Sequence, residues 1–239
     1  MRLTRRSLLA ALLLVLVAAT SALAADGPPS ILFVHGNGDS AALWITTIWR
    51  FESNGYDPSR LFAINYPHPL ARGDDTKPQE NRSGTADQLA ALAAKIAEIR
   101  AATGAARVAL VGSSRGGNAI RNYVKNTGGA DVSHVVLGGV PNHGVWATER
   151  DLNNEFNGRG PFLAGLNTAD EVQPGVRFLT LRSDSNDKYA QPDGRFIGRP
   201  GEPTNVTPDG PALRGATNLV LRGLDHREVA FHRLAFKKM

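Results

Sequence analysis

A serine between closely spaced glycines has the surroundings of a nucleophile. Ser114 is the middle residue of Gly-Ser-Ser-Arg-Gly at 112–116, which matches the pattern G-x-S-x-G. A β-branched apolar run at 107–111 precedes it and a helical stretch to about residue 126 follows it, so the serine is expected in a strained turn between strand and helix. Such a turn places the hydroxyl at a helix N-terminus, where N–H groups stabilise developing negative charge. The pattern alone also fits a plain glycine-serine turn, so partner residues must be found.

A serine nucleophile needs a base and an acid that orients the base, in the chain order serine, acid, histidine. His226 follows the strand candidate at 218–221, and Asp187 follows the one at 176–181. Both positions lie at carboxyl ends of strands, where open α/β sheets bind ligands. We therefore predict Ser114 as nucleophile, Asp187 as orienting acid and His226 as base, and we expect activity to fall below about pH 6, where histidine becomes protonated.

The choice of acid stays open at this point. Asp184 is closer to the strand end and is kept as the alternative acid, although a role in capping the turn fits it equally well. Asp225 adjoins the predicted base, so its side chain should point elsewhere. Among the other histidines, His143 is expected to line the substrate pocket, and the rest are interpreted as structural.

Two backbone amides are expected to form an oxyanion hole for an acyl-transfer intermediate. One is the N–H of Arg115, next to the nucleophile. The other is the N–H of Asn37, in the turn after the first apolar run at 30–34. Losing one such donor typically costs about 3–4 kcal/mol of transition-state stabilisation.

The elements that must position these residues alternate between strands and helices. Apolar runs predict six strands, at 30–34, 61–66, 107–111, 132–137, 176–181 and 218–221. Helical stretches separate them, one of them behind a capping box at 85–88. This alternation predicts an α/β fold with a mostly parallel six-stranded sheet and helices on both faces. The polar segment 145–174 is too long for a simple connection and is a candidate lid.

The N-terminus has the features of an export signal. Residues 1–24 carry three arginines within the first six positions, an apolar stretch at 8–19 and a small-residue cleavage site at 22–24. The apolar stretch is too short to span roughly 30 Å of hydrocarbon. Either the general secretory or the twin-arginine route fits, and we expect a single catalytic domain at 25–239 in the periplasm or outside the cell.

Charge and composition exclude several classes of function. The formal charge is +5, and removal of 1–24 takes three arginines and no acid, which lowers it to +2 and weakens a nucleic-acid interpretation. The absence of cysteine excludes a disulfide scaffold, a thiolate zinc site and a cysteine nucleophile. The acidic residues after 176–181 lack the EF-hand order, so we expect no metal and no cofactor.

With these motifs in place, the chain resembles secreted bacterial α/β-hydrolases of the lipase and esterase type, in particular small lipases with a minimal six-stranded core. The matching features are the motifs at 33–38, 112–117, 138–144 and 223–226 together with Asp187. The resemblance implies the same triad and oxyanion donors, a small-molecule or lipid ester as substrate, and transient contact with a lipid interface. From the charge we expect no nucleic-acid partner, and no obligate protein partner is evident from the sequence. Ser113 departs from the family, whose members usually carry histidine there.

Other interpretations remain. Gly-Asn-Gly-Asp-Ser-Ala at 36–41 matches the dinucleotide pattern G-x-G-x-x-A between a strand and a helix, which would suit a nicotinamide-dependent oxidoreductase. Such an enzyme wants an acid after the next strand to bind the ribose, and Ile-Asn-Tyr-Pro at 64–67 provides none. A non-catalytic binding module on the same scaffold is the other alternative. The ester class, from triglyceride to short ester or polyester, and acyl transfer to an alcohol stay open.

Overall fold

A six-stranded parallel sheet forms the centre of the molecule. The structure, a computed structural model, describes residues 27–184, 187, 189, 199–201 and 210–239, so the predicted export signal lies outside the described residues. The strand order is β2-β1-β5-β6-β7-β8, and every neighbouring pair is parallel. The strands are β1 (Ser30–Val34), β2 (Leu61–Ala63), β5 (Val108–Ser113), β6 (Val132–Gly138), β7 (Arg177–Ser183) and β8 (Thr217–Leu221). The predicted six-stranded, mostly parallel sheet is confirmed.

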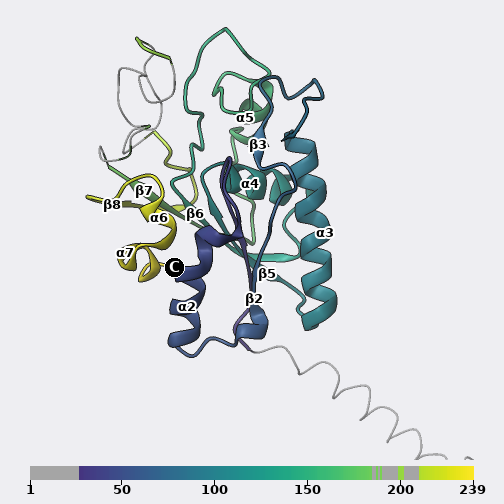
Figure 1. Cartoon of the computed structure of the whole chain (residues 1–239), viewed down its shortest axis with the longest axis vertical. Helices are drawn as coiled ribbons and strands as arrows, with labels where there is room; N and C mark the ends of the chain where they lie inside the picture. Colours follow the sequence, from purple (N-terminus) through teal and green to yellow (C-terminus); the bar gives the residue numbers. More distant parts are fainter. Residues whose placement is uncertain (1–26, 185–186, 188, 190–198, 202–209) are drawn as a thin grey trace, which may run out of the picture.

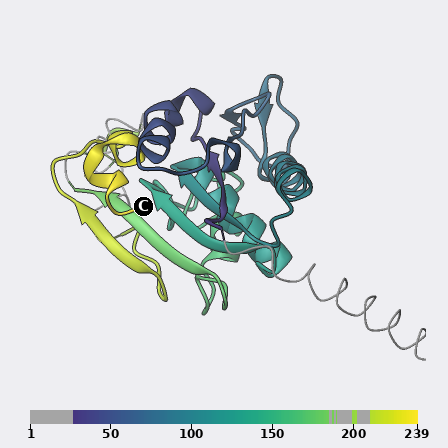
Figure 2. The same cartoon turned by 90° about the horizontal axis from the view of Figure 1, so that it is seen from below.

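Helices cover both faces of this sheet (Figure 2). On one face lie α3 (Thr85–Thr103) and α4 (Arg115–Thr127); on the other lie η1 (Ala41–Trp44), α2 (Ile45–Ser53), α6 (Glu228–Phe231) and α7 (Arg233–Phe236). All five residues of β1 are buried, and successive side chains alternate between the two core clusters. A strand covered on both faces gives the continuous apolar runs seen in the sequence.

Two further segments lie beyond the carboxyl ends of the strands, at the top of Figure 1. The segment 67–84 contains a two-stranded sheet of β3 (Leu70–Ala71) and β4 (Arg82–Ser83). The lid candidate 145–174 contains α5 (Pro161–Leu166). It contacts the 67–84 segment through hydrogen bonds from Asp75 N to Asn153 O (2.9 Å) and from Asn154 Nδ2 to Gly73 O (3.0 Å).

The start of α3 differs by one residue from the expectation. Its N-cap is Gly84, whose N–H donates to Asp87 Oδ2 at 2.7 Å, so the side chain that caps the helix start is Asp87 and the cap involves 84 and 87 rather than 85 and 88. The hydroxyl of Thr85 is occupied elsewhere, because it donates to Asp75 Oδ2 at 2.6 Å. A tertiary contact therefore displaces the predicted cap.

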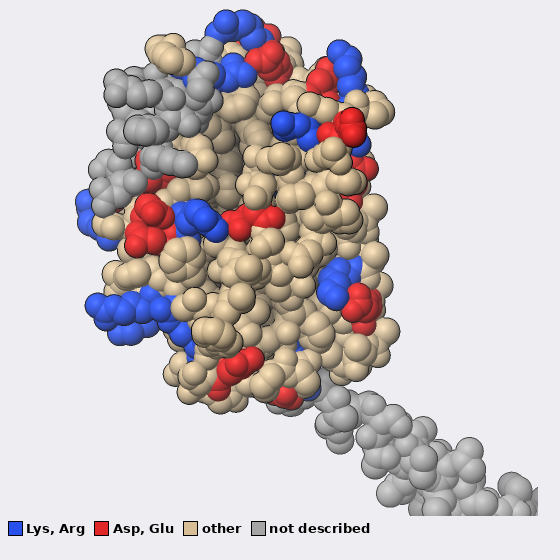
Figure 3. Space-filling view, viewed as in Figure 1, with Lys and Arg blue, Asp and Glu red and all other residues tan. Residues whose placement is uncertain are grey.

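The distribution of surface charge and the apolar character of the helices complete the description of the fold. On the face shown in Figure 3, basic and acidic side chains are interspersed among uncharged ones. Within the described ranges, no helix has both the length and the apolar character needed to cross a membrane.

Candidate active site

Ser114 lies in a strained turn between β5 and α4. Its backbone has φ 50° and ψ −123°, a region that residues with a side chain rarely adopt. The turn is possible because the residues two positions before and after the serine, Gly112 and Gly116, are glycines. A Cβ on Gly116 would lie 2.4 Å from His35 O, and one on Gly112 would lie 2.8 Å from Gly117 Cα. The local sequence therefore places a half-buried serine in the expected turn at a helix N-terminus.

The structure brings the three predicted catalytic residues into one hydrogen-bonded chain. Ser114 Oγ lies 3.0 Å from His226 Nε2, and His226 Nδ1 lies 2.8 Å from Asp187 Oδ2. Since an ionised carboxylate only accepts, Nδ1 carries the proton and Nε2 is free to accept the serine proton. Asp187 is only 3% exposed, and its other oxygen accepts the N–H of Tyr189 at 2.9 Å. The arrangement can therefore remove a proton from the serine hydroxyl.

The other two acids near His226, Asp184 and Asp225, accept hydrogen bonds from backbone N–H groups. Asp184 Oδ2 accepts the N–H of Gly223 at 3.0 Å. Asp225 Oδ1 accepts the N–H of Glu228 at 2.8 Å, while Glu228 Oε2 accepts the N–H of Asp225, also at 2.8 Å. This reciprocal cap fixes the turn in which His226 lies. The pattern Asp-x-x-Glu at 225–228 is the sequence signal from which this cap could have been predicted.

Tyr189 is a site residue that the sequence did not reveal. Its ring meets the His226 ring edge to face, with centroids 4.6 Å apart and planes at 73°. Together with its N–H bond to Asp187, this contact places Tyr189 against both the base and the acid. The sequence offers no signal for this role beyond proximity to the acid.

The turn after β1 faces the nucleophile. A Cβ on Gly36 would lie 3.0 Å from Ser114 Cβ, and Asn37 lines the same cavity as the serine. Among the described residues, the N–H of Asn37 has no acceptor, and the N–H of Arg115, as the first residue of α4, has no partner within the helix. Both amides are thus available as donors, and their role in an oxyanion hole stays a prediction.

The buried side chain of His35 fixes this turn through two hydrogen bonds. Its Nδ1–H donates to Gly36 O at 2.9 Å, and its Nε2 accepts the N–H of Tyr66 at 3.3 Å. Burial lowers the pKa of His35, and the bond to Gly36 O opposes that shift. The neutral imidazole therefore has one donor and one acceptor, and both are used.

A cavity of about 410 Å³ lies beside the nucleophile. It is lined by Gly36, Asn37, Asp39, Ser113, Ser114, Tyr189, Asp225, His226 and Arg227. Arg227 Nη2 and Asp39 Oδ2 form an ion pair of 2.8 Å between the start of α6 and the β1 turn. This lining is given for the described residues, and most of the segment 188–216, which follows the predicted acid, lies outside them.

His143 is not among the described residues that line this cavity, so its place in the substrate pocket stays a prediction. Its Nε2 lies 3.1 Å from Glu171 Oε1, and its Nδ1 lies against Gly210 O. The carboxylate of Glu171 also accepts the backbone N–H of Arg214 at 2.7 Å. These partners, distant in sequence, hold the imidazole in a network of its own.

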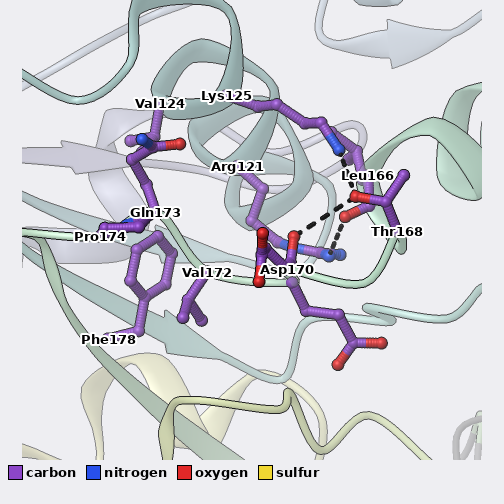
Figure 4. A pocket seen from close by; sticks show the side chains of 11 residues that line it. Arg121, Val124, Lys125, Leu166, Thr168, Asp170, Val172, Gln173, Pro174 and Phe178 are labelled. Atoms are coloured by element: carbon purple, nitrogen blue, oxygen red, sulfur yellow. Dashed lines mark hydrogen bonds between the residues drawn. The ribbon is translucent and has the colours of Figure 1, made fainter.

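A second cavity, of about 370 Å³, lies along α4, α5 and the segment 168–174 (Figure 4). The side chain of Arg121 extends from α4 into this region and is 3% exposed. It donates to Asn142 O at 2.8 Å, Asn167 Oδ1 at 2.6 Å and Leu166 O at 3.3 Å. Burial lowers the pKa of Arg121 to about 10. This arginine joins α4 to two loops without contacting the triad.

The dinucleotide interpretation of the 36–41 turn finds no support in the geometry. The N–H of Ala41 donates to Asn65 Oδ1 at 2.7 Å, and the N–H of Ala42 donates to Ser40 Oγ at 3.3 Å. These are the amides that would bind a pyrophosphate, and they are already used. Within the described residues, no cluster of three or more His, Asp or Glu could hold a metal ion.

Comparison with known proteins shows the family and the fold of the chain. The family model described as lipase (class 2) matches residues 28–147, which is half of the chain. A mature lipase from Bacillus licheniformis, BlEst2, superposes with a TM-score of 0.60 at 24% identity and covers 90% of this chain and 91% of its own. A monoacylglycerol lipase from Paleococcus ferrophilus superposes with a TM-score of 0.55 at 13% identity, with 89% and 92% covered. No curated protein sequence matches. The chain belongs to the class 2 lipase family and has the α/β-hydrolase fold.

Proposed function

We propose that the protein is an exported serine hydrolase that cleaves carboxylic esters through an acyl-enzyme on Ser114. The observation that carries this proposal is the hydrogen-bonded chain from Asp187 through His226 to Ser114, at the N-terminus of α4. Membership of the class 2 lipase family supports ester hydrolysis as the reaction. The signal-like segment 1–24 supports export by one of the two routes.

The mechanism follows from the atoms already paired. Ser114 Oγ attacks the ester carbonyl while His226 Nε2 takes its proton, and Asp187 stabilises the imidazolium that forms. The N–H groups of Asn37 and Arg115 bind the oxyanion of the tetrahedral intermediate. The intermediate collapses, the carbon–oxygen bond to the alcohol breaks, and His226 returns the proton to the leaving alkoxide. Water then repeats the sequence on the acyl-enzyme and releases the acid.

The substrate class is an ester of a small molecule or a lipid. The structural neighbours include a lipase and a monoacylglycerol lipase, so both soluble and interfacial esters are candidates. A rate series on p-nitrophenyl esters from acetyl to palmitoyl, with and without an emulsified interface, separates them. Preference for long chains that requires the interface identifies a lipase, and preference for soluble short chains identifies an esterase.

A fluorophosphonate probe tests the proposed nucleophile. We expect the wild-type protein to be labelled and Ser114→Ala to abolish both the label and ester hydrolysis. Ser133→Ala, in β6, is the matched control and should be labelled like the wild type. A folded wild-type protein that takes no label would overturn the proposal in favour of a non-catalytic binding module.

A further inference from the structure

The side chain of Arg115 is bound to two segments that lie outside the sheet. Its Nε donates to both oxygens of Glu155 at 2.9 Å, and its Nη2 donates to Glu155 Oε1 at 2.6 Å. Nη1 donates to Pro69 O and to Ser83 Oγ, each at 3.0 Å, and Nη2 also donates to Ser83 O at 2.6 Å. Each of the five guanidinium N–H groups therefore has an acceptor. Arg115 is 0% exposed and Glu155 is 2% exposed.

The side chain of Asn37 reaches the same part of the structure from the β1 turn. Asn37 Oδ1 accepts the N–H of Ala71, in β3, at 2.7 Å. The next residue, Gly38, donates its N–H to Pro69 O at 3.1 Å. This is the carbonyl that also accepts from Arg115. Asn37 and Arg115, the two residues proposed to bind the oxyanion through their backbone amides, therefore both bond to the β3–β4 segment through their side chains. Gly38, next to Asn37, adds a backbone bond to the same segment.

The position of the two donors depends on this connection. Asn37 follows β1 and Arg115 begins α4, so the two amides belong to separate elements. The β3–β4 sheet bonds to both, and Glu155 attaches the 145–174 segment to the same guanidinium. A displacement of about 1 Å at such a site can cost about 100-fold in rate. A planar guanidinium suits the task because it can bind a carboxylate and several other acceptors in one fixed geometry.

We propose that the Arg115 side chain, held by Glu155, is a positioning residue that sets the spacing of the oxyanion hole through the β3–β4 sheet. This inference rests on the proposed serine mechanism. A buried ion pair is weak evidence for a stabilising role, because desolvation of the charges offsets much of their attraction. A role in fixing geometry accounts for a fully bonded arginine directly behind the nucleophile.

The test compares ester turnover with binding of a boronic acid, whose tetrahedral adduct with Ser114 places an oxygen in the oxyanion hole. For Arg115→Met in the full chain, we expect kcat on a p-nitrophenyl ester to fall at least about tenfold. KM should change little, and the boronic acid Ki should rise by a factor similar to the loss in kcat. Glu155→Gln, which keeps an oxygen acceptor and removes the charge, should show the same pattern to a smaller extent.

The matched control is Arg121→Met, the same substitution at another buried arginine of α4. It removes bonds to Asn142 O and to Leu166 O at the end of α5, away from the proposed triad, so it should lower stability and leave kcat and the Ki of the folded protein close to wild type. Equal losses in both variants would overturn the proposal, because they would indicate general loosening of α4. Unchanged kcat and Ki in folded Arg115→Met would overturn it as well.

A further variant, Asn37→Ala, keeps the proposal testable if Arg115→Met does not fold. Asn37 is exposed, so Asn37→Ala keeps the backbone N–H, removes the bond to Ala71 and should fold. This variant should also lower kcat and raise the boronic acid Ki by similar factors. Unchanged values would contradict the proposed connection of the two amides through the β3–β4 sheet. A wild-type protein without turnover or label points to failure of the serine mechanism itself, whereas an active wild type with unaffected variants rejects only this inference.

Discussion

Asp187 Oδ2 lies 2.8 Å from His226 Nδ1, while Asp184, three residues earlier, accepts the backbone N–H of Gly223 at 3.0 Å. Both carboxylates therefore act on the connection between β8 and α6. Asp187 orients the imidazole, and Asp184 holds the backbone three residues before it. The two acids that the sequence left as alternatives have different structural tasks.

The two acids should differ sharply when each is changed to asparagine. In Asp187→Asn the new amide can donate to His226 Nδ1 and favour the wrong tautomer, so we expect kcat to fall by about 10⁴. In Asp184→Asn the amide oxygen can still accept the N–H of Gly223, and kcat should stay close to wild type. Steady-state kinetics on one soluble ester checks both. A larger loss in Asp184→Asn would reverse the assignment.

The strained backbone of Ser114 should be measurable as lost stability. Ser114→Ala removes the hydroxyl and keeps a Cβ at φ 50°, whereas Ser114→Gly also removes the Cβ. Relief of the strain should make the glycine variant about 1 kcal/mol more stable than the alanine variant, and both should be inactive. Urea unfolding gives the difference. An alanine variant of equal or greater stability would show that this turn stores no strain.

The features of the fold that depend on short stretches of sequence could be predicted. Parallel strands buried on both faces appear as continuous apolar runs, and all six were recognisable. The strained serine turn was recognisable only together with its context, an apolar strand before the G-x-S-x-G pattern and a helix after it, because the pattern alone also fits a plain glycine-serine turn. The placement of Asp187 and His226 followed from a rule of topology, that ligands bind at carboxyl ends of strands.

Features that depend on contacts between distant residues could not be predicted. The ring of His143 is bound by Glu171, 28 residues later, and no local pattern indicates this pairing. β3 and β4 have two residues each in a segment rich in glycine and proline, and their pairing is held by side chains from 37 and 115. No local pattern encodes such bonds, since they exist only once the sheet has formed.

The close approach of α4 to the β1 turn should make Gly116 intolerant of any side chain. A Cβ there would lie 2.4 Å from His35 O and 2.6 Å from Val34 O, and backbone atoms of β1 have little room to move. We expect Gly116→Ala to cost about 2–3 kcal/mol of stability and to lower kcat, because the β1 turn carries a proposed oxyanion donor. Thermal unfolding and kinetics measure the two effects.

Gly165→Ala is the matched control for that substitution. Gly165 lies in α5, and a Cβ there would have no atom within 4 Å. Alanine has the higher helix propensity, so this variant should gain up to about 1 kcal/mol. Similar losses in the two variants would show that close packing around Gly116 is not the cause.

His35 should make the stability of the protein depend on pH. Burial lowers its pKa in the folded state, while the unfolded chain takes up the proton near the ordinary value of 6.5. Between the folded pKa and 6.5 the unfolded state therefore binds more protons, so stability rises with pH. The contribution is complete above about pH 6.5 and is lost progressively below it, at up to about 1.4 kcal/mol per pH unit.

The measurement is the free energy of unfolding of wild type and His35→Gln between pH 5 and 8. The glutamine variant lacks the titrating group, so its stability should fall less steeply below about pH 6.5. His134→Gln is the control: burial also lowers the pKa of His134, but its side chain is exposed on β6, so less of the slope should disappear. If the free energy of unfolding of His35→Gln depends on pH as steeply as that of the wild type, His35 is not the group whose protonation destabilises the protein.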